Sequence, residues 1–194
     1  MISLTEMSSN LTNFITKDLE YNEDKKEIIH YAIETTLLSI FGTLLLILFA
    51  FAVNALKAAL FAAIFGVLLR RVSGGAHFNT PSKCLVIGAL LYSSIGFLAK
   101  TLVEYHLISD YILWLFLLLS LLIVFFLAPV DSENKPIHSV KLRFRLKGLS
   151  IAFVLVAFFI SLISSNLLLN VSMCMGILYQ SITLLPIFNK RGGG

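Results

Sequence analysis

A histidine and a cysteine lie seven residues apart in a short polar stretch of a chain that is otherwise strongly apolar. The stretch reads RVSGGAHFNTPSKC over residues 71–84 and contains His77 and Cys84. A thiolate beside an imidazole is the working pair of a cysteine peptidase, because the imidazole accepts the thiol proton and the thiolate attacks a carbonyl carbon. A His and a Cys in one polar loop more often share it by coincidence, so the surrounding residues decide whether the pair is catalytic.

His77 and Cys84 need a bend in the backbone if they are to meet. Seven residues of straight helix span about 10.5 Å, whereas proton transfer needs roughly 3 Å or one bridging water. The sequence provides such breaks, because Gly74-Gly75 precedes the histidine and Pro81 resists a helix that continues through it. We therefore expect the loop to fold back and bring the imidazole to the thiol.

The second half of the stretch predicts that a helix starts just before the cysteine. Thr80 is a suitable N-cap, and Pro81 suits the first helical position. Cys84 then lies in the first turn, where the positive end of the helix dipole and the neighbouring basic residues favour the thiolate. Free N–H groups at this helix start, or in the Gly74-Gly75 turn, are candidates for an oxyanion hole.

The elements that position this loop are expected to be membrane helices. Of the 194 residues, 58% are hydrophobic and only 13% are charged, whereas soluble domains carry about 25% charged residues. A spanning helix needs about 20 mainly apolar residues, and six stretches approach that length. We predict an all-α polytopic membrane protein with about six transmembrane or re-entrant helices, at Thr36–Val53, Ala55–Leu69, Leu85–Val103, Tyr111–Ala128, Leu149–Ser165 and Leu167–Phe188.

The chain before the first span is expected to form a separate N-terminal segment, residues 1–35. Six apolar residues at spacings of three and four predict an interfacial amphipathic helix, and Asn22 is a suitable cap for a second helix that runs on into the first span. Residues 36–191 then form the membrane domain, and 192–194 are a glycine tail. The apolar residues of the amphipathic face are Leu4, Met7, Leu11, Phe14, Ile15 and Leu19.

The basic residues predict how the spans are oriented. With six spans, 13 of the 15 Lys and Arg residues fall on the side that holds both termini, and only Lys57 and Lys100 fall opposite. The positive-inside rule makes the basic side cytoplasmic, so loops 70–84 and 131–148 are expected there. The two cysteines show no metal-binding or disulfide spacing, and we expect neither metal nor cofactor.

Three stretches of the chain resemble the accessory gene regulator protein B (AgrB) family. The stretch RRVSGGAHFNTPSKC, residues 70–84, resembles the Arg-(x)n-Gly-Gly-x-His-(x)6-Cys region of that family. LAPVDSENKPI, residues 127–137, resembles the loop after its fourth span, and SITLLPIF, residues 181–188, resembles its last span. Chain length and span pattern agree as well, so the resemblance covers nearly the whole chain.

The resemblance implies a membrane cysteine endopeptidase that processes a quorum-sensing propeptide in the bacterial cytoplasmic membrane. Such proteins remove the C-terminal tail of the precursor, hold the remainder as a thioester, and support its closure to a cyclic thiolactone. By this resemblance Cys84 is the nucleophile and His77 the general base, while Arg70 and Gly75 match positions with supporting roles. The resemblance also implies a homodimer.

Two further residues are candidates for orienting His77. Glu34 lies at the entrance to the first span, where an acidic residue is costly and usually paired, and it matches a family position more loosely. It is placed either to orient the imidazole as the third member of a triad or to pair with Arg70 or Lys57. Asn79 is a competing candidate that lies closer in sequence.

A basic segment precedes the fifth span and alternates with apolar residues. Such a segment is typical of a membrane-surface anchor, and it also suits the docking of an acidic propeptide tail. Nucleic acid is not expected to bind, because the segment is short and flanked by membrane spans. Its basic residues are Lys141, Arg143, Arg145 and Lys147.

Two non-enzymatic classes compete with the peptidase. In a channel or transporter, residues 70–84 would form a gate or re-entrant pore element, and polar residues would recur along one face of several spans. In a scaffold or regulator, Cys84 would be inert and would show no unusual thiol reactivity.

Overall fold

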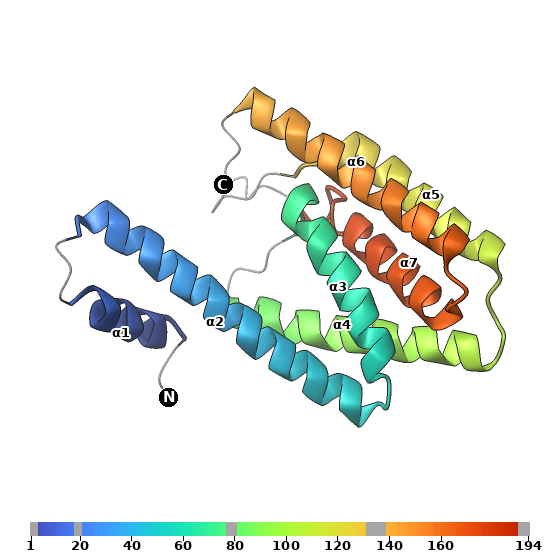
Figure 1. Ribbon diagram of the computed structural model, residues 1–194, viewed down its shortest axis with the longest axis horizontal. Coiled ribbons are helices and arrows are strands. Elements are labelled where there is room, and N and C mark those ends of the chain that lie inside the picture. The colour runs from blue at the N-terminus through green and yellow to red at the C-terminus, as the bar shows by residue number, and fades with distance from the viewer. Residues whose placement is uncertain (1–3, 18–20, 77–80, 131–138, 190–194) are drawn as a thin grey trace.

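The computed structural model describes residues 4–17, 21–76, 81–130 and 139–189, and this part of the chain is an all-α helical assembly (Figure 1). The helices follow one another through short connections. Within the described residues, extended backbone pairing is limited to one bridge between Gly74 and Val130. The helices are α1 (Leu4–Thr16), α2 (Glu23–Ala52), α3 (Leu56–Ser73), α4 (Pro81–Glu104), α5 (Asp110–Leu127), α6 (Val140–Ile163) and α7 (Leu167–Ile182).

Four of these helices, α2, α4, α5 and α6, are long and apolar enough to cross a membrane. Three helices differ in length from the predicted spans, and the first of them is α3, which continues to Ser73 instead of ending at Leu69. The fifth predicted span was expected to begin at Leu149, but α6 begins at Val140, where the Ser139 hydroxyl accepts a hydrogen bond from the Leu142 N–H at 3.4 Å. The last span was expected to reach Phe188, but α7 ends at Ile182 and the chain turns before Pro186, which has no N–H for a helix.

Small residues let the central helix α3 approach its neighbours closely. A Cβ atom on Gly96 of α4 would lie 2.4 Å from the Ala59 nitrogen of α3. A Cβ atom on Gly176 of α7 would lie 2.3 Å from the Ala62 carbonyl oxygen of α3. Such close backbone approach is how membrane helices gain packing energy when lipid removes the hydrophobic drive.

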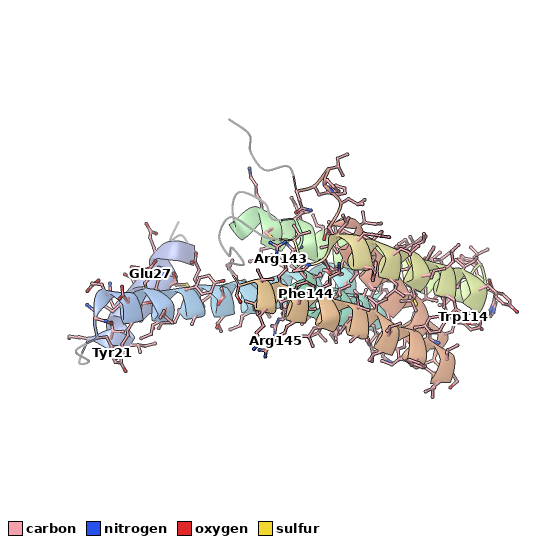
Figure 2. All side chains as sticks on the ribbon, turned by 90° about the horizontal axis from the view of Figure 1, so that it is seen from above. Tyr21, Glu27, Trp114, Arg143, Phe144 and Arg145 are labelled. Atoms are coloured by element: carbon pink, nitrogen blue, oxygen red, sulfur yellow. The ribbon has the colours of Figure 1, made fainter. Side chains whose placement is uncertain are left out.

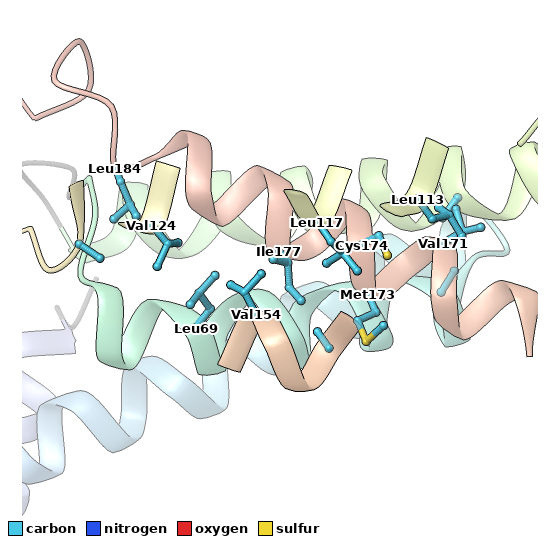
Figure 3. Close-up of a cluster of buried hydrophobic side chains, with 14 residues drawn as sticks. Leu69, Leu113, Leu117, Val124, Val154, Val171, Met173, Cys174, Ile177 and Leu184 are labelled. Atoms are coloured by element: carbon cyan, nitrogen blue, oxygen red, sulfur yellow. The ribbon is translucent and has the colours of Figure 1, made fainter. Parts of the chain in front are cut away.

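A second part of the core joins α3 to α5, α6 and α7 (Figure 3). Leu69, Val154 and Ile177 come from three different helices and are almost completely buried together. Their packing fixes the end of α3 from which the predicted catalytic loop departs.

The helices alternate in direction, so the bundle has two distinct ends. Gly66 of α3 lies against Tyr92 of α4, and Ala59 lies against Gly96, so α3 and α4 are antiparallel. We call the end that carries Arg70 and the start of α4 the site end, and the opposite end the far end.

Basic residues divide between these ends as the sequence predicts. Lys57 begins α3 at the far end, where the Lys100 ammonium also donates to the Asn54 carbonyl oxygen at 2.9 Å. Arg70 and Arg71 lie in the last turn of α3 at the site end.

Helix α1 packs on the N-terminal half of α2, beside the bundle (Figure 1). It buries Ser8, Thr12 and Thr16, while Met7 and Phe14 of the predicted apolar face stay exposed. The helix is therefore present as predicted, and its apolar face points away from the protein, as a helix lying in the membrane interface requires.

Candidate functional site

Three segments that are distant in sequence meet at the site end of the bundle. The end of α3 pairs with the chain that follows α5, because the Val130 N–H donates to the Ser73 carbonyl oxygen at 2.9 Å. The same backbone meets the end of α7, where the Ala76 N–H donates to the Thr183 carbonyl oxygen at 3.2 Å. These contacts unite the three stretches whose residues resemble one family.

The Gly74-Gly75 pair allows this convergence. Gly74 has a φ of +71° and Gly75 a φ of +134°, which side-chain-bearing residues rarely adopt. A Cβ atom on Gly74 would lie 2.2 Å from the Val130 carbonyl oxygen, and one on Gly75 would lie 2.7 Å from the Thr183 hydroxyl. Both positions therefore require glycine for conformation and for space.

Arg70 fixes the peptide unit immediately before the predicted base. Its guanidinium donates to the Ala76 carbonyl oxygen, and the side chain is half-buried at the end of α3. Because the next residue in the chain is His77, this contact sets where the loop begins. His77 and Asn79 themselves lie outside the described residues.

Glu34 is half-buried on α2, and its two predicted ion pairs do not form. Among the described side chains, the ion pairs are Lys26 with Glu23 at 2.9 Å and Lys100 with Glu104 at 3.5 Å. Arg70 therefore serves the loop backbone rather than Glu34. Within the residues that the structure describes, no three His, Cys, Asp or Glu side chains gather as a metal site would require.

Cys84 occupies the predicted position in the first turn of a helix. Helix α4 begins at Pro81, and the Cys84 side chain is half-buried there, whereas Cys174 is completely buried in α7. A half-buried thiol at a helix N-terminus is reachable and close to the positive end of the dipole. The two cysteines thus occupy the contrasting settings that their neighbours in sequence predict.

Two tyrosines meet where α4 packs against α7. The rings of Tyr92 in α4 and Tyr179 in α7 meet edge to face, with centroids 5.4 Å apart. Both phenols lie within electrostatic range of Arg70 and Cys84. The sequence analysis missed these tyrosines, because their pairing depends on the contact between two helices far apart in the chain.

Gln180 is the functional candidate that sequence reasoning overlooked most clearly. It is completely buried, and its Nε2 donates to the Gly74 carbonyl oxygen at 2.8 Å and lies 3.4 Å from the Ser73 hydroxyl. The available signal was the residue type, since a glutamine inside an apolar span is costly and usually has a partner.

The basic segment forms the first two turns of α6 rather than a loop. Lys141, Arg143 and Arg145 are exposed, and Figure 2 shows Arg143 and Arg145 on opposite sides of the helix. Lys147 lies over the Phe125 ring, with its ammonium 5.1 Å from the ring centroid. The segment thus presents positive charge around a helix at the site end.

Comparison with known proteins shows which sequence family the chain matches. The family model described as accessory gene regulator B matches residues 8–184. An AgrB-like protein of Clostridium perfringens strain SM101 is 31% identical, over 96% of this chain and 93% of the relative. The accessory gene regulator protein B of Staphylococcus intermedius is 35% identical, over 63% of this chain and 62% of the relative. No solved structure matches the chain.

Proposed function

Because the chain belongs to the accessory gene regulator B family, we propose that it is a membrane cysteine endopeptidase that cuts the C-terminal tail from an autoinducer propeptide and supports its cyclisation. Membership of the family gives the chain a role in accessory gene regulator quorum sensing. The observation that carries the proposal is the half-buried Cys84 in the first turn of α4. It follows a stretch of backbone, residues 73–76, that Val130 after α5 and Thr183 after α7 hold in place.

The first step transfers the propeptide to the enzyme. His77 takes the proton of Cys84, and the thiolate attacks the scissile carbonyl carbon to form a carbon–sulfur bond. The carbon–nitrogen bond then breaks, and the imidazolium gives its proton to the departing amine of the tail. The remainder of the propeptide is left as a thioester on Cys84, and no oxidant or reductant is needed.

The second step closes the ring and restores the enzyme. An internal thiol of the bound peptide loses its proton to His77 and attacks the thioester carbonyl carbon. A new carbon–sulfur bond forms within the peptide, the bond to Cys84 breaks, and the proton returns to the departing cysteine. A site recessed among apolar helices favours this transfer, because it limits hydrolysis of the thioester by water.

The exposed charges of α6 indicate the kind of propeptide that binds, and the apolar side of α1 indicates where in the membrane it binds. The basic turns of α6, with Lys141 and Arg145 exposed, attract an acidic tail, and the apolar side of α1 anchors in the same membrane surface. We place both termini and the site on the cytoplasmic face and expect a homodimer. Glu34 and Asn79 remain our candidates for orienting His77.

The pore alternative gains no support from the packing. Ser120 donates to the Phe116 carbonyl oxygen and Ser150 to the Leu146 carbonyl oxygen, both at 2.8 Å and both within their own helix. Ser93 of α4 donates to the Leu46 carbonyl oxygen of α2 at 3.5 Å, so these three hydroxyls are used in contacts within the protein. The space between α3, α5, α6 and α7 is filled by apolar side chains.

The test follows tail release in membranes that contain the protein and its cognate propeptide. We expect Cys84→Ala and His77→Ala to abolish release of the tail, measured by mass spectrometry. Cys174→Ala is the matched control and should release the tail as the native protein does. Equal release by the native protein and by Cys84→Ala would refute the proposal.

A further inference from the structure

We propose that Gln180 is a positioning residue for the peptidase reaction, because its amide holds the backbone that leads into His77. The inference rests on the proposed function and deepens it by adding α7 to the catalytic machinery. Gln180 lies in the last turn of α7 and 106 residues from Gly74, whose carbonyl oxygen it binds at 2.8 Å.

The orientation of the Gln180 amide is dictated by the loop. Rotating the amide by 180° would set its oxygen against the Gly74 carbonyl oxygen, and two acceptors repel each other. With Nε2 on Gly74, the buried Oε1 has no hydrogen-bond partner among the described residues. A buried acceptor without a donor is unfavourable for stability. Fold stability alone therefore does not explain a glutamine here, whereas the bond to Gly74 does.

One turn of α7 fixes consecutive peptide units of the loop. Thr183 follows Gln180 and donates its hydroxyl back to the Gln180 carbonyl oxygen at 2.7 Å. The Thr183 carbonyl oxygen receives the Ala76 N–H at 3.2 Å. Gly75 lies between the two side chains, since a Cβ atom on it would be 3.0 Å from the Gln180 nitrogen and 2.7 Å from the Thr183 hydroxyl. The loop thus has little freedom up to the residue before His77.

The same turn also contacts the helix that carries the nucleophile. Tyr179 precedes Gln180, and its ring meets that of Tyr92 on α4, the helix that begins just before Cys84. One turn of α7 therefore holds the loop before the base and supports the helix of the nucleophile. Relative placement of base and nucleophile is sensitive to such support, because a displacement of about 1 Å can cost about 100-fold in rate.

The experiment compares Gln180→Met with Gln180→Glu in a Cys174→Ala background, so that Cys84 is the one remaining cysteine of the two. Methionine keeps the side-chain length and removes both the donor and the unpartnered acceptor. The Gly74 carbonyl oxygen keeps the Ser73 hydroxyl as a donor at 3.2 Å, so the variant should still fold. We expect kcat for tail release to fall about 10- to 100-fold, with KM within about threefold, and Cys84 to react more slowly with iodoacetamide. Gln180→Glu can donate to the Gly74 carbonyl oxygen only as the protonated acid, which burial favours, so its kcat relative to the native protein should fall as the pH rises.

The matched control is Asn170→Leu, at the other end of α7. Asn170 is also buried and also has an unpartnered oxygen, but its nitrogen binds the Ser164 carbonyl oxygen at 2.9 Å, far from the loop. The free energy of unfolding of the Asn170→Leu variant is expected to differ from that of the native protein, while its kcat and its alkylation rate stay within about twofold of the native values.

Three results would overturn the inference. One is native kcat in a folded Gln180→Met variant, and another is an equal loss of kcat in Asn170→Leu. The third is a Gln180→Glu variant whose kcat, relative to the native protein, rises with pH, which would assign the role to the acceptor. If membranes with the native protein release no tail, the proposed function is refuted independently of the role of Gln180. The alkylation rate then decides about Gln180, since an unchanged rate refutes the positioning role and a slower rate supports it.

Discussion

A buried amide side chain lies near each end of α7, and the two amides bind partners at very different distances along the chain. Asn170 at the far end donates to the Ser164 carbonyl oxygen, six residues away in the chain. Gln180 at the site end donates to the Gly74 carbonyl oxygen, 106 residues away. Both side chains are buried, and each has an oxygen without a partner among the described residues.

The difference shows how this bundle separates fold from site. At the far end, a buried amide closes the connection between two consecutive helices. At the site end, it draws a distant loop onto the bundle, where Val130 and Thr183 also bind that loop. Substitutions at the site end should therefore reduce activity more than stability, and substitutions at the far end should do the reverse.

Apart from the proposed catalytic pair, the largest effect is expected for Gly74→Ala. The new Cβ atom would meet the Val130 carbonyl oxygen at 2.2 Å in a backbone conformation with φ of +71°. Adopting that conformation costs alanine about 1–3 kcal/mol, so we expect the loop to move and tail release to fall about 100-fold. The matched control is Gly148→Ala in α6, where nothing lies within 4 Å. Comparable losses in both variants would contradict the comparison.

A smaller effect is expected for Arg70→Lys. Lysine retains the charge but loses the planar fork of donors that binds the Ala76 carbonyl oxygen. We expect tail release to fall about tenfold, since a misplaced loop costs rate through geometry. Steady-state kinetics should show the loss in kcat. Arg71→Lys, at the neighbouring exposed position, should behave like the native protein, and an equal loss there would show that the effect is not specific to the contact between Arg70 and Ala76.

The basic turns of α6 should affect binding rather than chemistry. Replacing Lys141 and Arg145 by glutamine is expected to raise KM for the acidic-tailed propeptide a few fold at low ionic strength, because exposed charges act over about a Debye length. The increase should disappear in about 1 M salt, where that length is about 3 Å. A titration of KM against salt checks this. Replacing Lys57, which begins α3 at the far end, should leave KM unchanged.

The smallest effect on activity is expected for Lys100→Met at the far end. Its ammonium binds the Asn54 carbonyl oxygen at 2.9 Å and pairs with Glu104 at 3.5 Å. Loss of these partly exposed contacts should reduce the free energy of unfolding by about 0.5–1.5 kcal/mol. Thermal unfolding of the purified protein measures this reduction, and tail release should not change. A tenfold loss of activity would show that the far end contributes to the reaction.

Local rules in the sequence predicted the elements well. Asn22 caps α2, where its side chain accepts from the Lys25 N–H at 3.1 Å, and α4 begins at Pro81. These features depend on residues a few positions apart, so composition and spacing are sufficient to find them. The start of α6 was predicted too late because hydropathy places a boundary where basic residues end, whereas the Ser139 cap sets the boundary of the helix.

The contacts of the site could not be predicted in the same way. Cys84 and its helix position followed from local sequence, but Gln180 meets Gly74 only after α3 and α7 have packed through Gly176 and Ala62. The apolar periodicity of α3 contains no information about its contact with α7, and that of α7 contains none about its contact with α3. For the same reason, the apolar pattern of α1 was found, while the burial of Ser8 and Thr12 on α2 depends on the partner helix.

The most direct test of the central claim is to trap the acyl group on Cys84. The membranes would receive a propeptide whose internal nucleophile is replaced by alanine, so that the second step cannot occur. The account predicts that the protein gains the mass of the propeptide without its tail. It also predicts that hydroxylamine, which cleaves thioesters, removes the added mass, and that peptide mapping places it on Cys84. Release of the tail with no adduct, or an adduct on Cys174, would contradict it.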